Sequence, residues 1–190
     1  MGKTDEALRK ELESLREHLR SETRMKYGRV NPFCEDLFDW KEKGEFCGSE
    51  GTAIYDSATV IGDVTIGKNC WIGPFTMLDG SGKLTIGHHV DISTGVKIYT
   101  HDTVKRALTG GKNPTEVAPT SIGNNCFIGT DAVILKGVRI GNMCVIGANS
   151  LVNRNFPDRT IIAGAPAKKI GHVEMDRKGA VKLVYGRGKK

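Results

Sequence analysis

Large aliphatic residues recur every six positions along most of the chain. One run extends from Ile54 to Ile98, with a single two-residue slip after Leu84, and a second extends from Ile122 to Val152. This period fits neither the 3.6-residue turn of an α-helix nor the alternation of a simple strand. It fits a solenoid of short strands joined by tight turns, in which stacked coils bury a column of Ile and Val. The pattern predicts a mainly β chain.

The fourth position after each aliphatic residue is nearly always small or short. We expect this interior position to let the chain turn the corner between two strands. Three of the five cysteines, Cys70, Cys126 and Cys144, occupy it, and the chain has no CxxC spacing. Packing therefore accounts for these thiols better than a disulfide framework, a zinc site or a catalytic nucleophile does.

The N-terminal segment carries a helical pattern instead. Between Thr4 and Arg24, leucines recur at four-three-four spacing among charged residues, which predicts an amphipathic helix. The leucines are Leu8, Leu12, Leu15 and Leu19. They span only two heptads, which is too short a pattern to predict a coiled coil from the sequence.

A lead-in segment follows this helix. Residues 27–50 mix aromatic and acidic side chains without a clear period. We expect a helix-turn segment there that packs Phe33, Phe38 and Trp40 on the first coil. Residues 1–50 would thus form a helical cap or lead-in that shields the open end of the solenoid.

The solenoid is expected at 51–171, followed by a basic tail at 172–190. Residues 166–190 hold eight Lys or Arg and two Asp or Glu, an excess equal to the net charge of +6. Such a tail either contacts a phosphorylated ligand, nucleic acid or acidic lipid, or is simply solvated. Because no apolar run approaches the roughly 18 residues of a membrane span and no secretory signal is evident, we expect a cytoplasmic protein without membrane or nucleic-acid partners.

The six-residue repeat of aliphatic residues, called the ladder below, breaks between Ile98 and Ile122. A loop at 102–120 is expected to leave the solenoid there. Glycines and the Asn113-Pro114 pair mark this loop as turn-rich. Insertions in solenoids usually project on the binding side, and a structureless insertion of this length is more often functional than not. The functional residues are therefore expected at this break.

Three stretches carry a family resemblance: TIGKNCWIGPFT, TSIGNNCFIGTDAVILKGVRIGNMCVIGANSLV and IIAGAPAKKIG. Together they make residues 52–171 resemble the hexapeptide-repeat acyltransferases. The resemblance implies a triangular left-handed parallel β-helix of about five coils with three hexads per coil. It also implies acetyl-CoA as a co-substrate, no permanently bound cofactor, and a homotrimer whose active site is shared between subunits.

His101 is the candidate general base. It follows the last residue of the broken ladder by three positions, and the motif IYTHD is similar to the one that carries the catalytic histidine in sugar and xenobiotic acetyltransferases. The ordinary pKa of an imidazole, about 6.5, suits removal of a proton from an acceptor that attacks a thioester. We expect direct transfer rather than an acyl-enzyme, because the three interior cysteines are out of reach and no Ser-His pair is evident.

Four residues near His101 are candidates to bind the acceptor. Asp79 lies about one coil earlier, and it either binds an acceptor hydroxyl or serves an Asp-Gly turn. Asp102 is a candidate for the acceptor or for orienting the imidazole, a role that a backbone carbonyl would fill equally well. Lys105 and Arg106 are candidates to hold the phosphates of a nucleotide sugar.

The resemblance also implies a donor site in a groove between neighbouring subunits. The matching positions for the pantetheine arm of CoA are Gly129, Thr130, Ala148, Asn149, Asn153 and Arg154, and Lys168 and Lys169 lie near its phosphates by the same match. Small residues at such points let the backbone approach an extended ligand. Hexad corners require small residues in any case, so both explanations stay open.

The predicted function is acetyl transfer to an amino or hydroxyl group of a sugar, including a nucleotide-linked amino sugar for surface glycan. The alternatives are an amino-acid or antibiotic acceptor, or a non-catalytic hexapeptide-repeat scaffold. The attacking atom and the length of the acyl group stay open. We predict no metal site, because His88, His89 and His101 lack the spacing of the zinc ligands in γ-type carbonic anhydrases.

Overall fold

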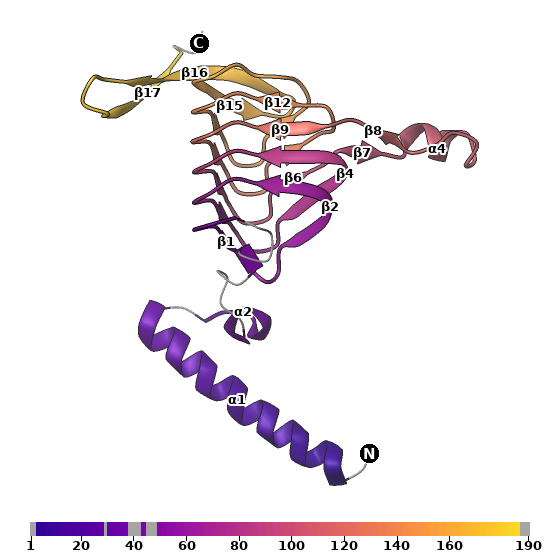
Figure 1. Ribbon diagram of the computed structural model, residues 1–190, viewed down its shortest axis with the longest axis vertical. Coiled ribbons are helices and arrows are strands. Elements are labelled where there is room, and N and C mark those ends of the chain that lie inside the picture. The colour runs from indigo at the N-terminus through magenta and orange to yellow at the C-terminus, as the bar shows by residue number, and fades with distance from the viewer. Residues whose placement is uncertain (1–2, 29, 38–42, 45–48, 187–190) are drawn as a thin grey trace.

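The computed structural model describes residues 3–28, 30–37, 43–44 and 49–186, and Figure 1 shows a tall β-solenoid with two helices at its N-terminal end. The helices are α1 (Lys3–Tyr27), α2 (Phe33–Leu37) and α4 (Val104–Leu108). The strands are β1 (Ala53–Ile54), β2 (Thr59–Ile66), β3 (Trp71–Ile72), β4 (Met77–Ile86), β5 (Asp91–Ile92), β6 (Lys97–Ile98), β7 (His101–Asp102), β8 (Glu116–Val117), β9 (Thr120–Ile122), β10 (Phe127–Ile128), β11 (Val133–Ile134), β12 (Arg139–Ile140), β13 (Val145–Ile146), β14 (Leu151–Val152), β15 (Thr160–Gly164), β16 (Ala167–Met175) and β17 (Val181–Tyr185).

The strands stack in parallel on three faces of a triangular solenoid. Face 1 contains β1, β3, β5, β10, β13 and β15. Face 2 contains β6, β11 and β14 with the first residues of β2 and β4, and face 3 contains β9 and β12 with the last residues of the same two strands. The six strands of face 1 correspond to about six coils, one more than the sequence predicted.

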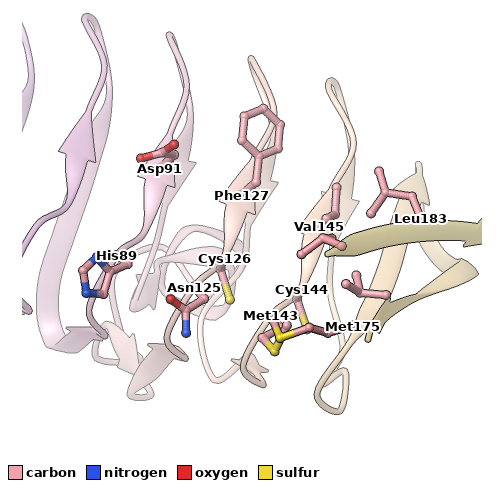
Figure 2. Close-up of a pocket in the computed structure, with 12 residues that line it drawn as sticks. His89, Asp91, Asn125, Cys126, Phe127, Met143, Cys144, Val145, Met175 and Leu183 are labelled. Carbon is pink, nitrogen blue, oxygen red and sulfur yellow. The ribbon is translucent and has the colours of Figure 1, made fainter. Parts of the chain in front are cut away.

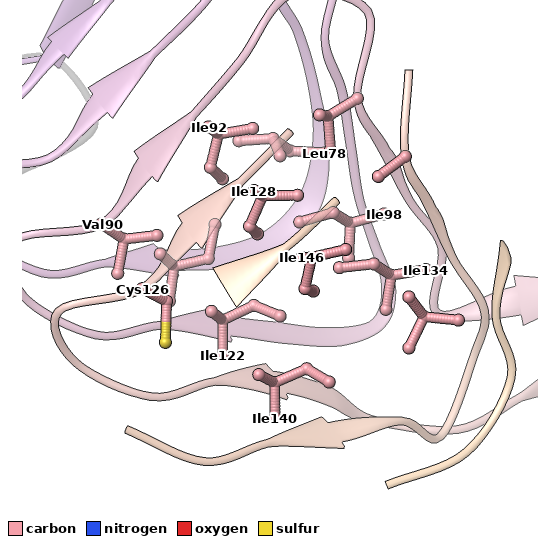
Figure 3. Close-up of a cluster of buried hydrophobic side chains, with 14 of the residues drawn as sticks. Leu78, Val90, Ile92, Ile98, Ile122, Cys126, Ile128, Ile134, Ile140 and Ile146 are labelled. Carbon is pink, nitrogen blue, oxygen red and sulfur yellow. The ribbon is translucent and has the colours of Figure 1, made fainter. Parts of the chain in front are cut away.

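The aliphatic ladder forms the core, as the six-residue period predicted. Ile128 lies in register between Ile92 and Ile146, and all three side chains are fully buried. Figure 3 shows the same column of inward-pointing residues. Burying one such side chain stabilises the fold by roughly 1.5–3 kcal/mol.

The interior cysteines pack in this core as predicted. Cys70, Cys126 and Cys144 are buried, and the thiol of Cys126 donates to the carbonyl oxygen of Gly141 on the next coil, at 3.1 Å. Burial raises the pKa of the Cys70 thiol, which disfavours the nucleophilic thiolate.

The two-residue slip in the ladder is a widened corner. β4 is ten residues long, because it begins on face 2, passes through the corner and ends on face 3. β2 does the same one coil earlier, and Gly62 has a φ of 70° where it crosses the corner against Gly80. A Cβ on Gly62 would lie 2.9 Å from the carbonyl carbon of Gly80, so only glycine fits there. Asp79 sits in this corner.

The interruption after Ile98 is an ordered arm, not a structureless loop. Antiparallel β7 and β8 form its base, with His101 opposite Val117, and α4 lies near its tip. Figure 1 shows the arm projecting sideways from the middle of the solenoid. The functional candidates at 101–106 therefore sit on a defined hairpin.

The N-terminal helices differ from the predicted cap. α1 extends away from the first coil in Figure 1, and α2 lies between it and the solenoid. The Glu35 carboxylate of α2 accepts hydrogen bonds from the backbone N–H groups of Asp56 (3.0 Å) and Ser57 (2.8 Å). The Nζ atom of Lys43 donates to the carbonyl oxygens of Asp56 and Ala58, each at 2.7 Å, so α2 and Lys43 both tie this segment to the first corner. The predicted packing of Phe38 and Trp40 lies outside the described residues. No helix within the described ranges is long and apolar enough to cross a membrane.

The C-terminal segment forms a β-hairpin, where the sequence predicted only a basic tail. β16 runs through the expected boundary at residue 171, pairs antiparallel with β15, and continues into a hairpin with β17. The hairpin projects past face 1 in Figure 1. Its apolar residues alternate along both strands, which is why the segment pairs as strands despite its positive charge.

Candidate active site

His101 and Asp79 form a hydrogen-bonded pair at the base of the arm. The Nδ1 atom of His101 lies 2.7 Å from the Oδ2 atom of Asp79. The two residues are 22 positions apart, but the stacking of β4 on β6 places Leu78 next to Ile98 and so brings the following residues together. The imidazole is 34% exposed, whereas the carboxylate is 2% exposed. The structure thus presents His101 to solvent with Asp79 behind it.

The Asp79 carboxylate is held on every side by its own corner. Its Oδ1 atom accepts from the backbone N–H (3.0 Å) and the hydroxyl (2.5 Å) of Ser81, and its Oδ2 atom accepts from the backbone N–H of Thr100 at 2.8 Å. The Thr100 hydroxyl lies 2.8 Å from the Asp79 carbonyl oxygen and accepts from the Gly82 N–H. Burial opposes ionisation of this carboxyl, but the hydrogen bonds from Ser81, Thr100 and His101 outweigh it and hold the Asp79 pKa well below its usual range.

This environment corrects the acceptor contact predicted for Asp79. A buried carboxylate whose oxygens already receive several hydrogen bonds has no atom free to bind an acceptor. Its bond to Ser81 is the Asp-Gly turn that the sequence offered as the other explanation. The structure also places Asp79 in contact with the imidazole, where the sequence had offered Asp102 or a backbone carbonyl as its partner.

The pair fixes the chemistry of the imidazole. An ionised carboxylate accepts but does not donate, so the hydrogen-bond network assigns the proton to Nδ1 of His101. The other nitrogen, Nε2, then carries a lone pair and can accept a proton from a nearby hydroxyl or amine. This is the geometry of a general base with an orienting carboxylate.

Asp102 points into an ion-pair network instead of toward His101. Its Oδ2 atom lies 2.8 Å from Nζ of Lys136, which also lies 2.9 Å from Glu116. Lys105 contacts the other oxygen of Glu116 at 2.5 Å. Lys136 keeps the pKa of the Asp102 carboxyl below its usual value. The network joins both strands of the arm to the next coil, so Asp102 and Lys105 have structural partners that the sequence did not reveal, whereas Arg106 is exposed on α4.

The predicted donor residues divide between two edges of the solenoid. Gly129, Thr130, Ala148 and Asn149 lie in turns between faces 1 and 2, and β16 places Lys168 beside Ala163 at the end of β15 that reaches the same edge. Asn153 and Arg154 follow β14 and lie at the edge between faces 2 and 3, the edge that also carries His101. Lys169 pairs with Ile162 further along β15. One copy of the chain therefore separates the two groups by the width of face 2.

His88 and the pocket beside the C-terminal hairpin lack the chemistry of the pair. His88 accepts a hydrogen bond at Nδ1 from the Lys68 N–H (2.8 Å), so it serves a solenoid corner. Within the described ranges, no three His, Cys, Asp or Glu side chains gather as metal ligands. A pocket of about 410 Å³ lies between face 1 and the C-terminal hairpin. Its lining side chains, mainly apolar ones such as Phe127, Val145 and Leu183, are drawn in Figure 2. It lies on face 1, away from the edge that carries His101.

The buried carboxylate makes the stability of the protein depend on pH. Folding lowers the pKa of Asp79, so its ionised form stabilises the folded state above the unfolded pKa of about 3.9, and this contribution is lost as the pH falls further. We expect Asp79→Asn to be less stable than the parent protein at neutral pH, with the difference shrinking below about pH 4. Urea denaturation at a series of pH values measures this difference. Asp91→Asn, at an exposed site, is the control, and a difference for Asp79→Asn that does not change with pH would contradict the assignment.

Comparison with known proteins agrees with this fold. A family model described as the hexapeptide repeat of succinyl-transferase matches residues 119–154. Protein CapG of Staphylococcus aureus is 46% identical over 99 residues, which cover 48% of this chain and 54% of CapG. The putative colanic acid biosynthesis acetyltransferase WcaF of Escherichia coli is 33% identical over 106 residues, which cover 55% of this chain and 56% of WcaF. The chain thus spans about half the length of these relatives.

A solved structure shows the same architecture. The N-acyltransferase AntD from Bacillus cereus, in complex with dTDP and 3-hydroxybutyryl-CoA, superposes with a TM-score of 0.59 at 26% identity, covering 65% of this chain and 70% of AntD. The stacked hexads, the three-faced solenoid and these similarities define a left-handed parallel β-helix. The chain is therefore similar to acyltransferases of the hexapeptide-repeat kind, both in sequence and in fold.

Proposed function

We propose that the protein is an acyl-CoA-dependent acetyltransferase that modifies an amino or hydroxyl group of a sugar, with His101 as general base. The observation that carries this proposal is the 2.7 Å contact between Nδ1 of His101 and the buried carboxylate of Asp79. It leaves Nε2 available at the exposed base of the arm. A histidine that merely stabilised the fold would have no need of a solvent-facing nitrogen.

The reaction follows from this arrangement. The acceptor hydroxyl or amine attacks the thioester carbonyl while Nε2 of His101 takes its proton. Collapse of the tetrahedral intermediate breaks the carbon–sulfur bond, and the imidazolium returns the proton to the CoA thiolate. Asp79 stabilises the imidazolium between these steps, because it remains ionised across the pH range in which imidazole titrates. The buried cysteines take no part, so no acyl-enzyme is required.

The sugar acceptor rests on the relatives and on the charge of the arm. WcaF is named for colanic acid biosynthesis, and AntD binds dTDP together with an acyl-CoA. A nucleotide-linked sugar fits both names. Arg106 is exposed on α4 of the arm, whereas Lys105 is paired with Glu116, so Arg106 is the candidate of the two to meet its phosphates. The acyl-CoA bound to AntD is 3-hydroxybutyryl-CoA, so an acyl group longer than acetyl is an alternative donor group.

The donor site is proposed to form between copies of the chain. Gly129, Ala148 and Lys168 lie near one edge of face 2, and His101 and Arg154 lie at the other. Within one copy, a donor that contacted both groups would have to span the whole of face 2. In a cyclic oligomer, one edge of each copy lies against the other edge of its neighbour, so the two groups come together between copies. A homotrimer with shared sites satisfies this requirement.

A thiol-release assay tests the proposal directly. The protein is mixed with acetyl-CoA and, in turn, nucleotide-linked amino sugars, free sugars, amino acids and aminoglycoside antibiotics. We expect turnover with a nucleotide-linked sugar. Turnover only with an amino acid or an antibiotic would replace the acceptor and keep the reaction, while no turnover with any of them would favour a scaffold.

A further inference from the structure

The helix α1 presents a row of leucine side chains to solvent. Leu8, Leu12 and Leu15 are 66%, 50% and 43% exposed. Their spacing places them on one side of the helix, where a helix of a globular protein normally meets its core. Three adjacent exposed leucines on a regular 25-residue helix indicate a surface that another molecule covers.

The described part of the chain does not cover this surface. Figure 1 shows α1 running away from the solenoid, with α2 beside only its C-terminal part. The contact with α2 is made there, where the Thr23 hydroxyl donates to Asp36 at 3.0 Å, and Leu19 is half-buried. The exposure of the leucines rises steadily from Leu15 to Leu8, with distance from α2.

We propose that α1 is a self-association helix, which packs in parallel against the same helix of other copies of this chain. The leucines occupy the two seam positions, a and d, of successive heptads, with Leu8 and Leu15 at d and Leu12 and Leu19 at a. The surface opposite the seam is charged and mixed in sign, and Glu6 pairs with Lys10 there along the same helix.

Charge complementarity beside the seam selects a second copy as the occupant and fixes its direction. Glu11 occupies a g position and Arg16 the following e position, which are the positions that face each other across a parallel pair. A parallel pair therefore places Glu11 of one copy beside Arg16 of the other, twice over. An antiparallel pair with Leu8 opposite Leu19 would bring Arg9 beside Arg16, and this like-charge contact disfavours it.

The short seam is sufficient when the solenoids also associate. Two heptads form a marginal coiled coil when isolated. Helices attached to solenoids that already contact one another meet at a high effective concentration, so a weak seam becomes occupied. A parallel arrangement also requires all copies to point the same way, as in a ring with rotational symmetry. The inference rests on the association of solenoids proposed above, and it does not depend on the proposed reaction.

Cross-linking of the full chain tests both the contact and its direction. Leu8→Cys is made with Cys34 and Cys47 replaced by Ser, and treated with a short bismaleimide. In a parallel pair the two copies of residue 8 are adjacent, and we expect efficient covalent dimers. In an antiparallel pair they are separated by eleven residues, or about 16 Å along the axis, and cross-link poorly. Glu17→Cys, on the side opposite the seam, is the matched control.

A charge exchange gives an independent readout. Glu11→Arg should lower the cross-linking rate of the Leu8→Cys protein several-fold, and adding Arg16→Glu should restore it, because the exchanged pair is again attractive. Glu17→Arg makes the same charge change away from the seam and should have no effect. Equal cross-linking of the residue 8 and residue 17 variants would overturn the proposal, since α1 would then lack a self-contact. Failure of the double exchange to restore the rate would overturn the parallel direction.

Discussion

Replacing His101 by Ala is expected to lower kcat for acyl transfer by about 10²–10⁴-fold, the contribution typical of a positioned general base. The variant lacks the only nitrogen that the Asp79 pair directs toward the exposed side of the arm base. Binding of CoA should be unchanged, because the predicted donor contacts come from other turns of the solenoid. Steady-state kinetics with the acceptor found in the thiol-release assay, together with calorimetric titration of CoA, measures the two quantities separately.

A matched histidine controls for loss of structure in this experiment. His89 is exposed at a different corner, and His89→Ala removes the same side chain without touching the pair. We expect this variant to retain its kcat. A His101→Ala protein that still transfers acyl groups at the parent rate would exclude the general-base mechanism, whichever acceptor is used.

The sequence was sufficient for the parts of the fold that repeat. Each hexad is a local signal, and the same side chain recurs at the same place in every coil, so the burial of Ile92, Ile128 and Ile146 follows from their spacing alone. The number of coils was underestimated by one, because β15 begins a new coil after a stretch without a hexad anchor, where Phe156 fills the core of face 3.

The orienting role of Asp79 could not be read from the sequence. Its distance from His101 along the chain equals about one coil plus the widened corner, so the sequence placed the two residues in neighbouring coils. Whether the carboxylate points inward or outward depends on how the two extra residues of β4 bend through the corner, and the six-residue period carries no information about them. The partners of Asp102 were hidden for a similar reason, since Lys136 approaches from the following coil.

The two ends of the chain show the limits of composition as a guide. The eight basic residues after position 165 indicated a basic tail, yet Val173, Met175, Val181 and Leu183 alternate with polar residues on both sides of a Gly179 turn. That alternation was the available signal for the β16–β17 hairpin. At the other end, the leucine spacing correctly predicted α1, but the sequence could not show that its apolar surface faces away from the solenoid.

The stacked column predicts that Ile128→Ala destabilises the protein by about 2–5 kcal/mol. Ile128 is fully buried between Ile92 and Ile146, and the rigid strands above and below cannot collapse to fill the cavity. Because each coil of a solenoid is stabilised by its neighbours, the loss weakens two interfaces at once. Urea denaturation at fixed protein concentration measures it. Phe127 is one residue earlier on the outer side of β10 and is 47% exposed, so Phe127→Ala should lower the free energy of unfolding far less. Equal losses of stability in the two variants would mean that the column does not carry the stability of the solenoid.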